Sequence, residues 1–196
     1  MKIDKYKVVL ASKSPRRREL LGKIIDNFDI ITADVDESFA EEVHPREAVE
    51  FLAIRKGAPV SSLCGEDTVV ISSDTLVELG GIPLGKPRSE KDAFAMLKSL
   101  SGRTHNVHTG VAVSLNGRTV SGVSTSSVSF RELSDEEISD YISTGEPMDK
   151  AGSYGIQGEG GRLVSGYDGD FDTIVGLPLK LTELLLKELV DEVEND

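Results

Sequence analysis

The sequence predicts a mixed α/β fold. Runs rich in β-branched residues indicate strands, above all at residues 68–79. Two further strand-like runs meet at Asn116 and Gly117, a dipeptide typical of tight hairpin turns. Segments with helical spacing alternate with these strands and begin at capping residues. Without a repeat or a clear linker, residues 1–196 are expected to form a single domain.

In the first third of the chain, residues 7–11 are expected to form a strand. Ser14 as N-cap and Pro15 as first helical residue predict a helix that ends near Gly22. A second strand is expected over residues 28–33, followed by an acidic loop at 34–37. Pro45 then opens a helix to about residue 62, with apolar residues at helical spacing.

The remaining elements follow the same reasoning. The strand at 68–79 is followed by a turn at Gly80 and Gly81. Ser89 is expected to cap a helix that extends to about residue 100. The hairpin is expected over residues 103–130. Ser134 and Glu137 have capping-box spacing at the start of a helix that ends near Gly145. Seven glycines within 150–170 predict irregular backbone, and a last helix is expected at 182–193.

Charge and cysteine content narrow the function classes. The chain has 22 Lys and Arg against 34 Asp and Glu, a net charge of −12, which disfavours general binding to duplex nucleic acid. A phosphorylated ligand would need cations concentrated in one place. Cys64 is the only cysteine, which excludes an internal disulfide and a CxxC redox pair. With no signal-peptide core and no membrane span, we expect a cytoplasmic protein without membrane partners.

One polar stretch interrupts the apolar strand at 68–79. Asp74 stands at its centre and is followed by Thr75. A carboxylate there suits a general base or a metal ligand, although a structural Asp is the alternative. Lys86, in a Gly-Lys-Pro turn, offers a point charge for phosphate. Taken by itself, this tripeptide favours the simpler interpretation of an exposed lysine on a turn.

A second group of candidates lies where the first strand meets its helix. Ser12, Ser14, Arg16 and Arg17 gather there, and three consecutive arginines in a first helical turn oppose the helix dipole. This arrangement favours a bound anion, for which phosphate is the natural candidate. A solvated cationic helix start is equally compatible, and Arg18 is the arginine expected to be surface.

Three more polar residues are candidates that need support from elsewhere. Glu37 in the acidic loop could help to hold a hard cation, and Lys56 could point from its helix toward a phosphate. Gln157 carries the donor and acceptor needed to read a base edge. The three histidines are interpreted as structural, since His105 and His108 lie on opposite faces of one strand. No P-loop motif is present.

Taken in order, several segments resemble the Maf family of nucleoside triphosphate pyrophosphatases. The matching segments are LASKSPRRRELL, ADVDE, FLAIRK, ISSDTLVELGGIPLGKP, LSGRTHNVHTGV, YISTGEPMDKAGSYGIQGEGG and IVGLPL. The resemblance implies an elongated, curved mixed sheet with flanking helices and two lobes around a cleft. It also implies a homodimer, a divalent cation (Mg²⁺ or Mn²⁺), and hydrolysis of a nucleoside triphosphate to the monophosphate and pyrophosphate.

The resemblance also assigns roles to particular residues. It makes Asp74 the catalytic proton acceptor. Our hypothesis is that the divalent cation is held near Glu37 and Asp74, and the sequence leaves open whether Asp74 acts as base, as metal ligand or as both. Arg16, Thr75 and Gln157 match positions that set substrate specificity. The positions implied to contact the phosphates are Ser12, Arg17, Lys56 and Lys86.

Within the family, Thr75 and the segment around Gln157 are similar to the branch that prefers dTTP and UTP, with modified or noncanonical nucleotides as further substrates. A second branch prefers 7-methyl-GTP. A third hypothesis is a non-catalytic nucleotide-binding regulator of septum formation, consistent with a link between the family and cell-division arrest. Lys13, Asp172 and Thr173 depart from the family pattern beside the catalytic positions, which leaves kinetics and minor substrates open.

Overall fold

The computed structural model describes residues 3, 5–40 and 43–195, and it is mixed α/β, as predicted. In chain order, the strands are β1 (Lys7–Leu10), β2 (Asp29–Ile30), β3 (Thr68–Leu79), β4 (Ile82–Leu84), β5 (Thr104–Leu115), β6 (Arg118–Phe130) and β7 (Val164–Asp168). The α-helices are α1 (Pro15–Leu21), α2 (Pro45–Leu63), α3 (Glu90–Leu100), α4 (Asp135–Ser143), α5 (Phe171–Val175) and α6 (Leu179–Glu194). Three 3₁₀ turns lie at Glu146–Asp149 (η1), Ala151–Ser153 (η2) and Glu159–Leu163 (η3).

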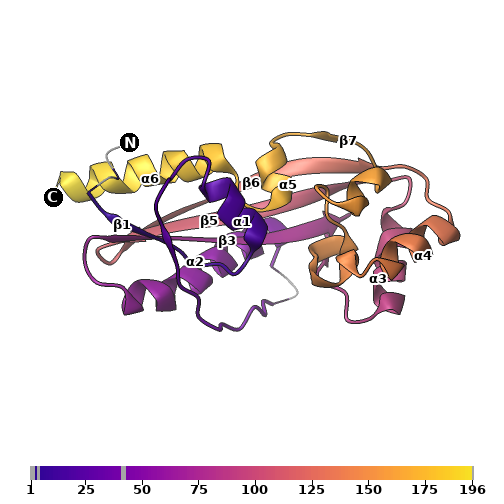
Figure 1. Cartoon of the computed structure of the whole chain (residues 1–196), viewed down its shortest axis with the longest axis horizontal. Coiled ribbons are helices and arrows are strands. Elements are labelled where there is room, and N and C mark those ends of the chain that lie inside the picture. Colours follow the sequence, from indigo (N-terminus) through magenta and orange to yellow (C-terminus); the bar gives the residue numbers. More distant parts are fainter. Residues whose placement is uncertain (1–2, 4, 41–42, 196) are drawn as a thin grey trace.

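The strands form one seven-stranded mixed sheet in the order β2-β1-β3-β5-β6-β7, with β4 paired to β3. β1 lies parallel to β2 and β3, whereas β3, β5 and β6 are antiparallel neighbours. The long strands run through the whole length of the molecule, with α6 along one side and α2 along the other (Figure 1). The helices α3 and α4 lie at the far end, so the sheet carries two lobes (Figure 1).

Alternate residues of β3 explain why there are two lobes. On one face, Val69 and Ile71 belong to a hydrophobic core that includes leucines of α1 and α6. On the same face, Val77 and Leu79 belong to a second core with α3 and α4. Ser73 and Thr75 fall between these cores, because side chains two residues apart share a face. The polar stretch of the sequence is therefore the break between two hydrophobic cores.

The opposite face of the sheet is covered by α2. Gly110 of β5 pairs with Asp74, and a Cβ at Gly110 would lie 2.3 Å from the carbonyl oxygen of Val49 in α2. A side chain at this position would therefore push the helix away from the sheet. Glycine lets α2 approach β5 closely, and the same helix carries Lys56 toward Asp74.

Most elements match the expectations from sequence, including both caps at Ser14 and Ser89 and the capping box at Ser134. The predicted strand at 28–33 is wrong in extent, because only Asp29–Ile30 pairs with β1. The short helix α5 and the strand β7 were not predicted, and α6 begins at Leu179 rather than at residue 182. Among the described residues, no helix is both long and apolar enough to cross a membrane.

Candidate active site

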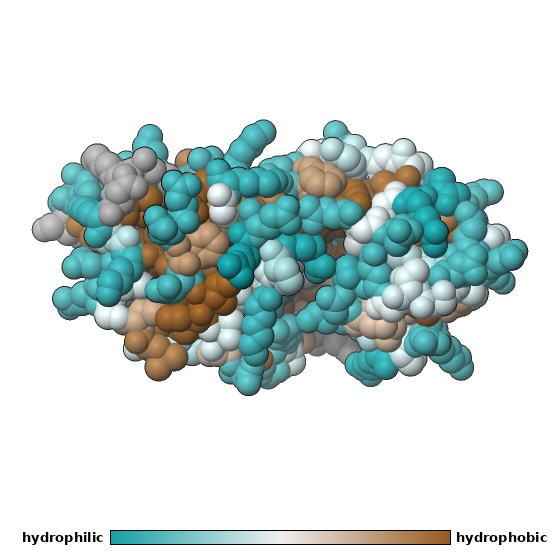
Figure 2. Space-filling view, in the orientation of Figure 1, coloured by the Kyte–Doolittle hydropathy of each residue, from teal (hydrophilic) through white to brown (hydrophobic). Residues whose placement is uncertain are grey.

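A cleft of about 990 Å³ opens where the two cores separate. Hydrophilic side chains gather over the middle of the molecule, between the lobes (Figure 2). Every site residue predicted from sequence lines this cleft: Ser12, Arg16, Arg17, Glu37, Lys56, Asp74, Thr75, Lys86 and Gln157. The structure therefore brings together side chains that the sequence spreads over about 145 positions.

An edge of the sheet forms the floor of the cleft. β1 pairs with β3 over Thr68–Ile71, and β4 pairs with β3 over Val77–Leu79. Residues 72–76 lie between these two partner strands, and Asp74, Thr75 and Leu76 of this stretch line the cleft. The strand positions Asp74 rigidly, because its other edge is paired with β5 throughout this stretch.

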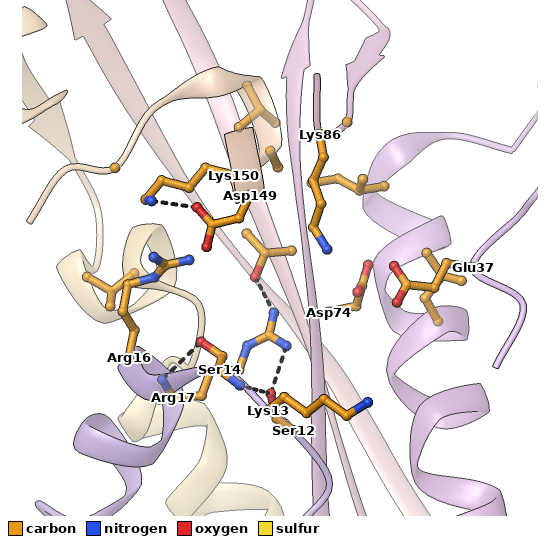
Figure 3. Close-up of a pocket in the computed structure, with 18 of the residues that line it drawn as sticks. Ser12, Lys13, Ser14, Arg16, Arg17, Glu37, Asp74, Lys86, Asp149 and Lys150 are labelled. Carbon is orange, nitrogen blue, oxygen red and sulfur yellow. Dashed lines mark hydrogen bonds and ion pairs between the residues drawn. The ribbon is translucent and has the colours of Figure 1, made fainter. Parts of the chain in front are cut away.

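Asp74 is buried, with 5% of its surface exposed, and it faces Lys56. The Lys56 ammonium forms ion pairs with the carboxylates of Asp74 and Glu37, the second at 3.1 Å. Arg55 holds the loop that carries Glu37, donating to the carbonyl oxygens of Asp36 and Ser38 at 2.8 Å each. Figure 3 shows Asp74 between Glu37 on one side and the ammonium of Lys86 on the other.

Arg17 is the most constrained cation of the cleft. Its Nε donates to the carbonyl oxygen of Gly176 at 2.9 Å, and its Nη1 donates to that of Ser73 at 2.8 Å. Its Nη2 donates to Thr75 Oγ1 at 3.1 Å. Burial lowers the pKa of the guanidinium from its ordinary value, and the negative charge of Asp74 opposes this effect. Such a fork, half-buried and held at three nitrogens, suits recognition of a phosphate.

Gly176 makes this arrangement of Arg17 possible. Its φ is 120°, a region that side chains rarely adopt, and a Cβ there would lie 3.3 Å from both Arg17 Nε and Thr75 Oγ1. The turn after α5 therefore needs a glycine in order to aim its carbonyl oxygen at the arginine. This contact explains why a glycine stands at position 176.

The loop before α1 supplies Ser12 and Arg16. Ser12 is buried, and its hydroxyl accepts from the backbone N–H of Ser14 at 3.2 Å. Arg16 reaches across the cleft toward Asp149 (Figure 3). The pKa of Asp149 lies below its ordinary value, chiefly because Lys150 donates to it, with a further contribution from the positive charge of Arg16. Arg18 is exposed, as predicted.

Gln157 projects from the glycine-rich segment, which one carboxylate organises. Glu146 Oε1 accepts from Tyr141 Oη at 2.9 Å and from the N–H of Gly160 at 3.1 Å, and its Oε2 accepts from the N–H of Glu159 at 2.9 Å. Burial alone would raise the pKa of Glu146, but these hydrogen bonds lower it overall. The exposed amide of Gln157 is thus carried by an ordered loop.

Lys86 stands on the turn that follows β4. Gly85 accepts a hydrogen bond from the N–H of Gly152 at 3.0 Å, and the buried Pro87 follows, so the turn is attached to the second lobe. Lys86 itself is exposed and points its ammonium into the cleft (Figure 3).

Sequence reasoning missed several charged residues of the cleft. Asp149 and Lys150 line it, and the Lys150 ammonium donates to Asp149 Oδ1 and to the carbonyl oxygen of Glu146, both at 2.7 Å. Lys13 also lines the cleft, and its Nζ lies 3.5 Å from Asp34 Oδ1. The signal was present in the sequence, because Asp149 and Lys150 directly precede the glycine-rich segment that carries Gln157.

The histidines stand apart from the cleft, as expected. His105 contacts Tyr154 Oη at 2.8 Å within a cluster of aromatic rings, and burial lowers its pKa to about 4. His108 contacts Glu78 Oε2 at 3.0 Å. Burial opposes ionisation of Glu78, but hydrogen bonds from Gly81, His108 and Asn106 outweigh it and lower the pKa of Glu78 to about 2.

Among the residues that the structure describes, no cluster of three or more His, Cys, Asp or Glu could hold a metal ion. Mg²⁺, however, is commonly bound through one or two carboxylates together with substrate phosphates. Glu37 and Asp74 already converge on one cation, the Lys56 ammonium. Their oxygens therefore fit a divalent cation that is shared with a phosphorylated ligand.

The fold and the site define a class: an α/β protein with a cleft lined by cationic side chains and a buried carboxylate at its floor. The Maf-like protein family matches residues 7–189, and the chain belongs to this family. It is 49% identical over 174 residues, 89% of this chain and 93% of the relative, to a dTTP/UTP pyrophosphatase of Thermococcus onnurineus.

A second relative, a dTTP/UTP pyrophosphatase of Clostridium beijerinckii, is 45% identical over 93% of this chain and 99% of its own length. Among solved structures, the Ham1 protein of Staphylococcus aureus aligns with a TM-score of 0.47 at 19% identity. That alignment covers 63% of this chain and 71% of the other.

Proposed function

We propose that the protein hydrolyses dTTP and UTP to the nucleoside monophosphate and pyrophosphate. The observation that carries the proposal is the buried carboxylate of Asp74 in a cleft where Arg17, Lys56 and Lys86 concentrate positive charge within an acidic chain. The names of the curated relatives support the choice of these two substrates.

In the proposed reaction, Asp74 accepts a proton from water as the water oxygen bonds to the α-phosphorus. The bond between the α-phosphorus and the oxygen that bridges to the β-phosphorus breaks, and pyrophosphate leaves with that electron pair. Arg17, Lys56 and Lys86 hold the triphosphate and stabilise the charge that develops on the leaving group. Positioning by β3 fixes the carboxylate that is to orient the attacking water.

Glu37 and Asp74 would hold a divalent cation, Mg²⁺ or Mn²⁺, which supplies further neutralisation of phosphate charge when it is bound. Lys56 has two anionic partners in the structure and would turn to the phosphates in the substrate complex. Arg16 and Gln157 are proposed to set the substrate preference, with the Gln157 amide at the base edge. The hydroxyl of Thr75, the third position that matched a specificity residue, accepts a hydrogen bond from Arg17. We further propose one Maf-like domain, a homodimer and a cytoplasmic location.

Two measurements test the proposed function. Pyrophosphate release is measured from dTTP, UTP, CTP, GTP and 7-methyl-GTP with Mg²⁺ or Mn²⁺, and we expect release from dTTP and UTP in preference to the others. Preference for 7-methyl-GTP would move the protein to the other branch, and nucleotide binding without release would indicate a regulator. In H₂¹⁸O, the label is expected in the monophosphate; label in pyrophosphate would contradict attack at the α-phosphorus.

A further inference from the structure

The hydroxyl of Thr75 is already engaged by the protein. Its Oγ1 lies 3.1 Å from Arg17 Nη2 and 2.9 Å from Thr109 Oγ1. Thr75 and Thr109 are direct partners in the pairing of β3 with β5, which fixes the distance between their side chains. A residue expected to select the substrate therefore has its only hydroxyl bonded to other side chains.

The direction of each hydrogen bond follows from counting protons. A guanidinium only donates, so Thr75 accepts from Arg17. Thr109 donates its one proton to the carbonyl oxygen of Thr173 at 2.8 Å, and it can therefore only accept from Thr75. Thr75 donates its own proton to Thr109. The result is a one-way chain from Arg17 through Thr75 and Thr109 to the backbone of α5.

Because the inner part of this chain of hydrogen bonds is buried, each hydroxyl there depends on its protein partners. Thr109 is 0% exposed, so water does not replace a missing partner, and an unpaired group there would carry a desolvation cost. The end of the chain is equally fixed, because Thr173 is also 0% exposed and its Oγ1 lies 2.7 Å from Ser124 Oγ. This chain of hydrogen bonds thus holds Nη2 of Arg17, whereas the carbonyl oxygens of Ser73 and Gly176 hold Nη1 and Nε.

We propose that Thr109 is a positioning residue for the cleft, and that Thr75 acts on the substrate through Arg17. In this arrangement Thr109 fixes the hydroxyl of Thr75, which fixes the aim of the guanidinium at the phosphates. Thr75 then contributes equally to every nucleoside triphosphate, and the base is selected elsewhere in the cleft. The part of this inference that concerns nucleotide turnover rests on the proposed function. The part that concerns binding of pyrophosphate does not depend on it.

The test compares Thr109→Val, which removes the hydroxyl and keeps the shape, with Thr109→Ser, which keeps the hydroxyl. We measure kcat/KM for dTTP, UTP and CTP, and the Kd of inorganic pyrophosphate by calorimetry. Thr109→Val is expected to lower kcat/KM about tenfold for all three nucleotides and to weaken pyrophosphate binding by a similar factor, because the Thr75 hydroxyl that accepts from Arg17 loses its own acceptor. Thr109→Ser is expected to restore both values.

Two further variants sharpen the test. Thr75→Val is expected to match Thr109→Val, and the double variant to lose no more than either, because all three break one chain. Ser126→Ala is the matched control: its buried hydroxyl donates to the carbonyl oxygen of Asp170 at 2.9 Å, without a contact to Arg17. Its pyrophosphate affinity is expected to equal that of the wild type.

The outcomes separate this inference from the proposed function. If Thr109→Val folds and binds pyrophosphate as tightly as the wild type, the positioning role is wrong. A changed ratio of UTP to CTP turnover in Thr75→Val alone would show direct base reading and overturn the chain. If the wild type hydrolyses no nucleotide while pyrophosphate affinity depends on Thr109, the inference stands and the proposed reaction fails. Should Thr109→Val not fold, Thr109→Ala, which also removes the hydroxyl of Thr109 and leaves Thr75 unchanged, is compared with Thr109→Ser instead.

Discussion

At the scale of single residues, the cleft contains two kinds of polar side chain. Arg17 and Thr75 have their hydrogen-bonding atoms engaged by the protein, so their geometry is fixed before any ligand binds. Gln157 makes no hydrogen bond with the residues that the structure describes, and its amide faces the cleft from an exposed position. The first kind suits a constant feature of the substrate, the phosphates, and the second suits a variable one, the base.

This division predicts the effect of Gln157→Glu. The change removes the amide donor and adds a negative charge, so an acceptor on the base loses its partner. We expect kcat/KM for UTP to fall by about 10- to 100-fold, with a changed ratio of UTP to CTP turnover. Glu159→Gln, which alters charge on the same exposed loop, is the control and is expected to leave that ratio unchanged. An unchanged ratio in Gln157→Glu would remove Gln157 from base recognition.

The residue types of the site could be predicted from sequence, but their connections could not. Asp74 was recognisable because a carboxylate in an apolar strand conflicts with its surroundings. The Lys56 contact to Asp74 joins positions 18 residues apart, and the Arg17 contact to Gly176 joins positions 159 residues apart. Contacts at such separations depend on how the elements pack, which no local pattern encodes.

At the scale of elements, the approach of α2 to the sheet places Lys56 beside Asp74. Two glycines permit that approach: Gly110 in β5, and Gly57 in α2, where a Cβ would lie 2.6 Å from Ser72 Oγ. The turn dipeptide Asn116–Gly117 between two strand-like runs predicted the hairpin of β5 and β6. Local patterns did not predict that β2 has only two residues, nor the helix α5. Both short elements depend on contacts with neighbouring segments rather than on their own periodicity.

Gly110→Ala is expected to separate the helix from the sheet. The added Cβ would meet backbone atoms of Val49 and Glu50, which move only with the helix. We expect a loss of about 1–3 kcal/mol in the free energy of unfolding by urea, as in other overpacked cores, together with lower kcat as Lys56 shifts. The control is Gly65→Ala, where no atom lies within 4 Å of the new Cβ. Equal stability of the two variants would show that α2 is not held by this contact.

At the scale of the whole molecule, one sheet carries two hydrophobic cores with the cleft between them. Because the chain has a net charge of −12, a phosphorylated ligand would need cationic side chains gathered in one place, and the cleft gathers them. The mixed α/β class was predicted from periodicity. The two-lobed arrangement came from the resemblance, because the division of β3 between two cores depends on which helices cover each end.

Buried titratable groups make the stability of the molecule depend on pH. His105 is 2% exposed, and its pKa falls from 6.5 to about 4 on folding. Below about pH 6.5 the unfolded chain binds a proton that the folded chain excludes, so stability decreases as the pH falls toward 4. We expect a loss of about 3 kcal/mol over this window from His105, measured by urea unfolding at pH 7, 5 and 4.

His105→Phe isolates this contribution. The phenyl ring would lie among Phe130 and Tyr154 without a titrating nitrogen. The variant is expected to lose stability at pH 7, because Tyr154 loses its partner, but to show a smaller decrease between pH 6.5 and 4. The same decrease in both proteins would assign the pH dependence to groups other than His105. Glu78 contributes mainly outside this window, because its stabilisation is lost as the pH falls below 4.5.

The account depends most on Asp74 as the proton acceptor, and one comparison tests it directly. Asp74→Asn keeps the size of the side chain and removes its basicity. With dTTP and Mg²⁺, we expect kcat to fall by about 10² to 10⁴, the range of general-base catalysis, while thermal unfolding and pyrophosphate binding stay close to those of the wild type. A folded Asp74→Asn variant that releases pyrophosphate within a fewfold of the wild-type rate would contradict the mechanism.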